Sequence, residues 1–192
     1  MRRKGSAKLK RMRRPSGREN ARVLIASGLS DAARRGVVRL GVLNLACAFG
    51  KLGRNVRKRE GDGVTPAGRW RLVRVLYRAD RIRRPVTGLP VKAIGPCDGW
   101  CDAPADPNYN RPVRLPYAAS AETLWRPDGL YDVAVVLNHN SRPRVRGAGS
   151  AIFMHVARPG YLPTEGCIAL QREHLLALLR RVGTGAAIRV LP

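Results

Sequence analysis

Long hydrophobic runs are missing from the sequence. No run of about eighteen apolar residues occurs, which excludes a membrane-spanning helix. A recognisable signal peptide is also missing, because the basic residues 1–4 are followed only by the short apolar stretch 23–26. The apolar residues around Cys47 resemble a lipobox, but Asn44 stands where leucine is required. The sequence therefore gives no clear export signal.

Cysteine is sparse, with four residues at irregular spacing: Cys47, Cys97, Cys101 and Cys167. Cys97 and Cys101 could supply two metal ligands, yet no second Cys or His pair stands at the spacing of a zinc site. A disulfide between them would need a particular backbone geometry, so two ordinary thiols are favoured. We expect no metal and no other cofactor.

A phosphate-binding loop is also missing. Glycines punctuate residues 50–68, but the G-K-[ST] ending is missing, and Glu60 and Asp62 would repel phosphate. These glycines instead indicate a tight turn that presents Thr65 and Pro66.

Acidic residues are few: 13 Asp and Glu stand against 37 Lys and Arg, for a formal net charge of +24. Such a surface attracts polyanions, and charge alone does not choose among nucleic acid, an anionic membrane and an acidic cell-wall polymer. Residues 1–22 are densely basic, with Glu19 as their single acid and no aromatic residue. Base stacking is therefore not indicated, and we expect no specific nucleic-acid partner.

We expect residues 1–30 to form a basic, disordered arm. The functional alternative is an electrostatic tether to an anionic polymer or a membrane surface. The rest of the chain, residues 31–192, is long enough for one domain with a substantial core.

The hydrophobic patterns predict a mainly β domain with a single well-formed helix. Leucines at helical spacing place the helix at 171–182, with Gly183 as its stop. Prolines and glycines recur in segment 78–116, which indicates long loops that either line a substrate cleft or pack as a lid. Alternating or continuous apolar residues predict strands at 37–43 and 45–50 (joined around Asn44), 69–77, 131–137 and 187–191.

The most informative stretch is 149–170. His155 ends an apolar run, and Cys167 follows twelve residues later, after a loop rich in proline and glycine. A strand ending in histidine, a loop, and a Gly166-Cys167 step into a second strand would bring an imidazole and a thiol face to face. The alternative is that Cys167 is a buried apolar residue and His155 a satisfied core residue.

This arrangement suits nucleophilic catalysis by a thiol. The thiolate is the attacking species, so we expect an active Cys167 to have a depressed pKa. His155 would accept its proton and return it to the leaving group. The backbone N–H groups of Gly166 and Cys167 could face a developing oxyanion.

Three blocks of sequence carry a resemblance to a known family. The runs S-A-I-F-M-H (150–155) and T-E-G-C-I-A-L (164–170) resemble the signature of the L,D-transpeptidase (YkuD-type) catalytic domain. The run K-R-E-G-D-G-V-T-P-A-G (58–68) resembles a segment near the start of that domain, and 131–140 resembles the strand before its histidine strand. The blocks follow the family's order and span roughly 37–190.

The resemblance implies a β-sandwich or barrel over 31–192, with one helix after the strand of the catalytic cysteine. It implies a cysteine-dependent acyltransferase that acts on peptidoglycan stem peptides through a thioester, without a cofactor, in the cell envelope or periplasm. Cys167 would be the nucleophile, His155 the proton acceptor and donor, and Gly166 an oxyanion donor. Thr164 and Glu165 would contact substrate.

Two departures separate this sequence from the family pattern. Glu165 stands where many members have histidine, and Ala169 stands where many have arginine or asparagine. The group that orients His155 stays open among a backbone carbonyl, Asn138 and His139. Two alternative functions also stay open: an L,D-carboxypeptidase or endopeptidase that uses water as acceptor, and a non-enzymatic polyanion-binding module.

Overall fold

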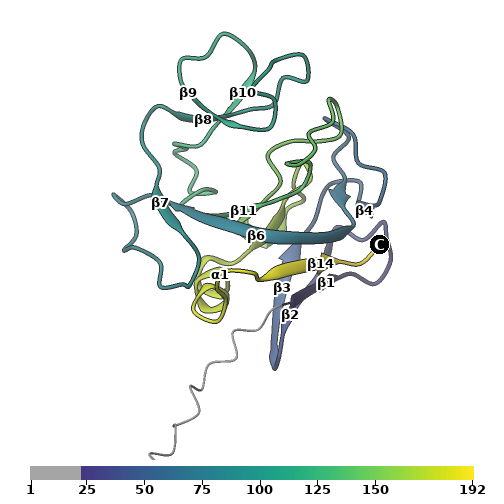
Figure 1. The fold of residues 1–192 in the computed structure, drawn as a ribbon. Coiled ribbons are helices and arrows are strands. Elements are labelled where there is room, and N and C mark those ends of the chain that lie inside the picture. Colours follow the sequence, from purple (N-terminus) through teal and green to yellow (C-terminus); the bar gives the residue numbers. More distant parts are fainter. Residues whose placement is uncertain (1–22) are drawn as a thin grey trace, which may run out of the picture.

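The computed structural model describes residues 23–192. Nine strands form one large sheet in the order β11-β12-β13-β3-β2-β1-β14-β6-β7, and β11 also pairs with β6. This second pairing closes the sheet into a barrel (Figure 1). Its strands are β1 (Val23–Ser27), β2 (Arg35–Leu40), β3 (Leu43–Ala48), β6 (Gly68–Tyr77), β7 (Val91–Ala93), β11 (Val133–Leu137), β12 (Phe153–Val156), β13 (Ile168–Leu170) and β14 (Ala187–Val190).

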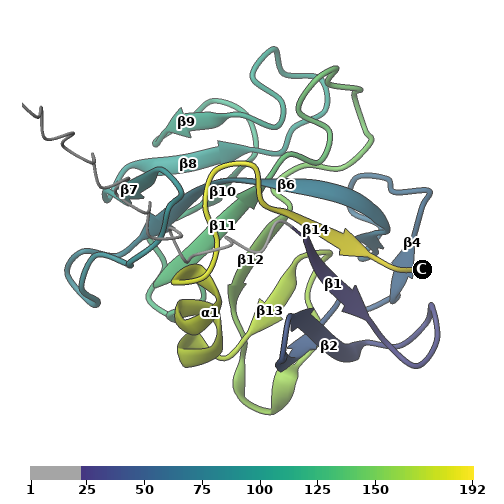
Figure 2. The same cartoon turned by 60° about the horizontal axis from the view of Figure 1, so that its bottom comes forward.

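The fold class predicted from the sequence is confirmed: residues 23–192 are mainly β, with one α-helix, α1 (Arg172–Leu179), directly after the strand that follows Cys167. Figure 2 shows α1 beside β12 and β13. Leu175, Leu178 and Leu179 turn its apolar side into the barrel core. No helix in this part of the chain is long and apolar enough to cross a bilayer.

The expected boundary of the folded domain is wrong. β1 pairs in parallel with β14 and antiparallel with β2, so the sheet already includes residues from Val23 onward rather than from residue 31. Leu24 and Ala26 are fully buried, because alternate residues of β1 face the core. Residues 1–22 of the expected arm lie outside the described residues.

The first hairpin turns earlier than its sequence predicts. Leu40 pairs with Leu43, so the turn consists of Gly41 and Val42, and Asn44 belongs to β3. Gly41 has a φ of +57°, a conformation that a two-residue hairpin turn requires and that glycine adopts easily.

The two faces of β11 separate two apolar clusters. Val133, Val135 and Leu137 face the barrel core, whereas Ala134 and Val136 face outward into a second cluster that contains Trp100. The same alternation on β12 sends Met154 inward and Phe153 outward. The side chain of His155, two residues after Phe153 on the same strand, therefore also lies outside the barrel.

A small three-stranded sheet covers this outer face (Figure 1). It consists of β8 (Asp98–Cys101), β9 (Pro112–Arg114) and β10 (Ala121–Thr123), and two further short strands, β4 (Arg54–Asn55) and β5 (Thr65–Pro66), pair with each other. Trp100 of β8 packs edge-on against Phe153, with ring centroids 5.2 Å apart. Within the segment expected to form loops, β8 thus packs as a lid.

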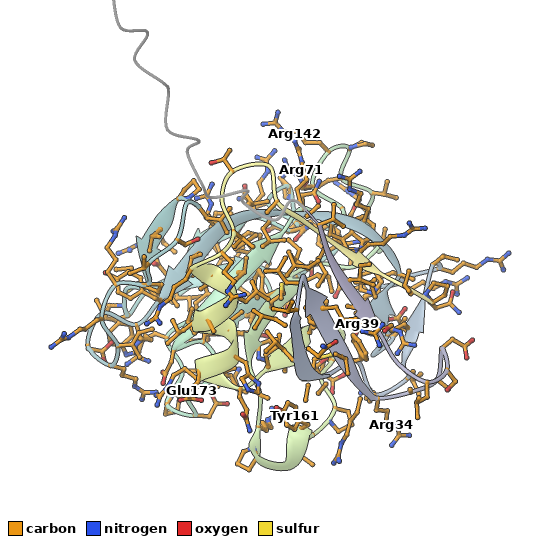
Figure 3. All side chains as sticks on the ribbon, turned by 90° about the horizontal axis from the view of Figure 1, so that it is seen from below. Arg34, Arg39, Arg71, Arg142, Tyr161 and Glu173 are labelled. Atoms are coloured by element: carbon orange, nitrogen blue, oxygen red, sulfur yellow. The ribbon has the colours of Figure 1, made fainter. Side chains whose placement is uncertain are left out.

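Most arginines of residues 23–192 lie on the outside, as Figure 3 shows for Arg34, Arg39, Arg71 and Arg142. Arg54 is an exception at 2% exposure. Its guanidinium donates to the carbonyls of Leu191 (2.8 Å), Ala33 (3.1 Å) and Ser30, and lies over the ring of Phe49. The buried charge thereby joins the loop between β1 and β2 to the residue that follows β14.

Candidate active site

The parallel pairing of β12 with β13 places His155 and Cys167 on neighbouring segments. Met154 pairs with Ile168 and His155 with Ala169, so Cys167 lies just before the point where β13 joins β12. His155 and Cys167 line the same cavity, which has a volume of about 360 Å³ between the barrel and the small sheet. The structure thus brings together the two residues that the sequence selected.

The Cys167 thiol is held by the backbone of β12 and the residues before it. Its Sγ donates to the carbonyl of Ala151 (3.2 Å) and accepts from the N–H of Phe153 (3.3 Å). Burial raises the pKa of Cys167 to about 12, so the resting thiol is protonated at neutral pH. The expectation of a depressed pKa is wrong for this resting structure, because desolvation of the thiolate by burial outweighs the groups that lower the pKa of Cys167.

The imidazole of His155 is also buried, at 5% exposure. Its Nδ1 lies 2.9 Å from the carbonyl oxygen of Val156, and a carbonyl can only accept, so Nδ1 carries the proton. This leaves Nε2 unprotonated and able to act as a base. Burial lowers the pKa of His155 to about 4. The ring of Tyr131 packs edge-on against the imidazole at 5.5 Å.

Of the three candidates for orienting His155, the backbone carbonyl is the one that contacts it. Asn138 accepts a hydrogen bond from the N–H of Arg71 (2.6 Å). His139 lies 2.9 Å from the carbonyl of Ala148 through its Nε2. Neither side chain forms a hydrogen bond with His155.

The step before Cys167 is a local turn built on Thr164. The N–H of Gly166 donates to Thr164 Oγ1 (3.1 Å), and this hydroxyl donates to the carbonyl of Cys167 (2.7 Å). The expected oxyanion role of the Gly166 N–H is thus corrected, because that donor is already used. No acceptor for the N–H of Cys167 is found among the backbone hydrogen bonds of residues 23–192.

Gly166 is required for two reasons. Its φ of +137° lies in a region that side-chain-bearing residues rarely adopt. A Cβ there would lie 2.8 Å from the carbonyl oxygen of Val64 and 3.3 Å from Nζ of Lys58. The block at 58–68 therefore packs directly beneath the Gly166-Cys167 step.

Thr65, which the sequence only placed in a tight turn, is a structural part of the site. Its fully buried hydroxyl donates to the carbonyl of Cys167 (3.2 Å) and accepts from the N–H of Gly50 (2.8 Å). Its position in the block at 58–68, which resembles a segment of a known family, was the available signal, but a partner 102 positions away cannot be deduced from the sequence.

Lys58 was also missed. Its side chain is 4% exposed and forms an ion pair with Asp62. Asp62 in turn accepts from the N–H groups of Arg59 (2.7 Å) and Val64 (2.9 Å), which fixes the turn. The nearby Lys58 charge lowers the pKa of Cys167, although the opposing effect of burial is larger.

The two expected substrate contacts line the cavity. Thr164 is buried, whereas the Glu165 side chain is 77% exposed at the rim and pairs with Lys51 (2.7 Å). Ala169, the other departure from the family pattern, lines the wall and adds no polar group. Within residues 23–192, no group of three or more His, Cys, Asp or Glu side chains is placed to hold a metal ion.

Comparisons with known proteins place the chain in a family. The sequence profile of the L,D-transpeptidase catalytic domain (YkuD) matches residues 29–190. No curated protein matches the chain. Among solved structures, the chain is similar to L,D-transpeptidase 1 of Mycobacterium tuberculosis, with 16% identity, a TM-score of 0.39, and coverage of 90% of this chain and 60% of that one. The chain thus spans less than two thirds of that structure's length.

Proposed function

Because the chain belongs to the L,D-transpeptidase catalytic domain family, we propose that it is a cysteine-dependent acyltransferase that acts on peptidoglycan stem peptides in the cell envelope. One observation carries the proposal. Cys167 and His155 line one cavity, and Nδ1 of His155 is committed to the Val156 carbonyl, which leaves Nε2 as the base.

The chemistry follows from these positions. Cys167 Sγ attacks the carbonyl carbon of a diamino-acid residue while Nε2 of His155 accepts the thiol proton. The imidazolium gives that proton to the leaving nitrogen, the C–N bond breaks, the terminal D-amino acid departs, and a thioester remains. Because the resting pKa of the thiol is high and that of the imidazole is low, proton transfer accompanies formation of the S–C bond.

The N–H of Cys167 is the donor that we assign to the developing oxyanion, in place of that of Gly166. The Thr65 and Thr164 hydroxyls fix the carbonyl of Cys167 from two sides and thereby hold this peptide group in place. An amine that attacks the thioester gives a crosslink; water gives a shortened peptide.

The proposal is tested by intact-mass spectrometry after incubation with a carbapenem, which acylates the nucleophilic cysteine of this family. We expect one adduct on the wild type, none on Cys167→Ala, and at least a hundredfold slower formation on His155→Gln, because general base catalysis is lost. Cys97→Ala, which removes a half-buried cysteine that does not line the cavity, is the matched control. An adduct that persists in Cys167→Ala contradicts the proposal.

A further inference from the structure

One wall of the cavity carries two carboxylates without a cationic partner. Glu60 and Asp102 line the cavity, and neither forms an ion pair within residues 23–192. The other carboxylates of the cavity are paired, Glu122 with Arg126 and Glu165 with Lys51. In a chain with a formal net charge of +24, cations that could neutralise Glu60 and Asp102 are abundant, yet none within residues 23–192 forms an ion pair with either.

The same wall contains two buried polar atoms without a hydrogen-bond partner among the described residues, Asp102 Oδ1 and Ser150 Oγ. Ser150 is only 6% exposed and lines the cavity. The hydroxyl of Tyr109, which lies near Ser150, donates to Glu60, and Ser150 Oγ has no hydrogen-bond partner within residues 23–192. Buried polar groups are normally hydrogen-bonded, so these atoms indicate that a ligand with hydrogen-bond donors completes the wall.

The backbone holds this wall rigidly next to Cys167. Asn110 accepts from the N–H of Ala151 (3.2 Å), the residue after Ser150, and its own N–H donates to the carbonyl of Cys101 (2.8 Å), the residue before Asp102. The carbonyl of Ala151 also receives the Cys167 thiol. A short series of direct contacts therefore links the segments that carry Asp102 and Ser150 to Cys167.

We propose that Glu60, Asp102 and Ser150 form a binding site for a primary ammonium group of the peptide that acylates Cys167. A primary ammonium has three donors and one positive charge, which matches three acceptor side chains and two carboxylates. A metal ion fits less well, because no metal-binding group of His, Cys, Asp and Glu side chains is found in residues 23–192. The inference rests on the proposed function, since the ligand is the acyl donor.

The amine in this site is one that positions the substrate rather than one that attacks. Two carboxylates stabilise the protonated form of an amine, and a protonated amine has no lone pair for attack on a thioester. The site therefore recognises the side-chain ammonium of the diamino-acid residue in the acyl donor, and the attacking acceptor binds elsewhere.

The test measures binding separately from chemistry. Isothermal titration of Cys167→Ala protein uses two stem tetrapeptides, one with a free side-chain amine on the diamino-acid residue and one with that amine acetylated. We expect the free amine to bind on the order of tenfold more tightly, since hydrogen bonds to charged groups contribute more than neutral ones. In the background of Cys167→Ala, Glu60→Gln with Asp102→Asn is expected to bring the two affinities within about twofold.

Asp31→Asn is the matched control, because Asp31 is exposed, forms no ion pair within residues 23–192 and does not line the cavity. Equal binding of the two peptides to Cys167→Ala protein overturns the inference, and so does a preference that survives the double substitution in a protein with unchanged thermal unfolding. A preference for the free amine without any acylation of the wild-type protein supports the site and overturns the proposed function instead.

Discussion

The hydroxyl of Thr65 donates to the carbonyl of Cys167 across 3.2 Å, although the two residues lie 102 positions apart. The same hydroxyl receives the N–H of Gly50. Through this contact, the turn at 58–68 holds the backbone of the Gly166-Cys167 step in place.

Replacing Thr65 with valine keeps the shape of the side chain and removes both hydrogen bonds. We expect the free energy of unfolding to fall by about 1–3 kcal/mol, because a buried N–H and a buried carbonyl each lose a partner. The rate of carbapenem acylation of Cys167 is expected to fall as well, whereas Thr65→Ser is expected to retain both properties. Urea unfolding and timed mass spectrometry measure the two effects; a valine variant that acylates at the wild-type rate would contradict the assigned role.

Burial of neutral His155 makes stability depend on pH. Its pKa falls from 6.5 to about 4 on folding, so between these values the unfolded state binds more protons than the folded state. The contribution of His155 is fully present above pH 6.5 and is lost as the pH falls toward 4. It amounts to about 3 kcal/mol.

The measurement compares the unfolding free energies of wild type and His155→Gln from pH 7 to pH 4. As the pH falls, the unfolding free energy of the wild type is expected to decrease more than that of His155→Gln. A difference that does not change with pH would show that His155 is not buried in its neutral form, and it would also remove the argument for Nε2 as a ready base.

Lys58→Met removes the cation that lies beneath Gly166. The variant leaves the carboxylate of Asp62 without its ion-pair partner, and we expect a loss of stability on the order of 2 kcal/mol, below the range for fully buried pairs because Asp62 stays 20% exposed. The pKa of Cys167 is expected to rise further, because the Lys58 charge that lowers it is gone.

Peptide mapping after iodoacetamide treatment at several pH values follows the alkylation of Cys167. The profile of Lys58→Met is expected to move to higher pH than that of the wild type, while Lys58→Arg keeps the charge and is expected to move less. If the pH profile of Cys167 alkylation is the same in Lys58→Met and the wild type, Lys58 stabilises the fold but does not lower the pKa of Cys167.

Arg54→Met separates stability from chemistry. The guanidinium of Arg54 donates to three backbone carbonyls whose residues do not line the cavity, so we expect a loss of about 3 kcal/mol without a change in the acylation rate of the folded protein. Chemical unfolding gives the first quantity, and acylation measured well below the melting temperature gives the second. If folded Arg54→Met protein is acylated much more slowly than the wild type, the charge of Arg54 also affects the site.

The sequence predicted what local patterns encode. The alternation in 69–77 and the leucine spacing in 171–182 identified β6 and α1, because each pattern reflects a single buried face. His155 and Cys167 were selected because an imidazole and a thiol flanked by strand patterns are chemically distinctive. The two residues line one cavity, and their catalytic roles stay a prediction.

What the sequence did not predict depends on contacts between distant segments. The partner of His155 is the carbonyl of Val156, and carbonyls are present at every position, so the sequence alone cannot single one out. The donor at Gly166 is occupied because a turn conformation brings Thr164 to it. The raised pKa of Cys167 likewise follows from burial in the folded chain, which local patterns do not reveal.

The first and last strands of the barrel are neighbours: β14 lies between β1 and β6. During synthesis on the ribosome, β1 emerges long before the strand that pairs with its outer edge. The edge of β1 therefore stays open until β14 has left the exit tunnel, and the nascent chain can close its barrel only after that strand has emerged.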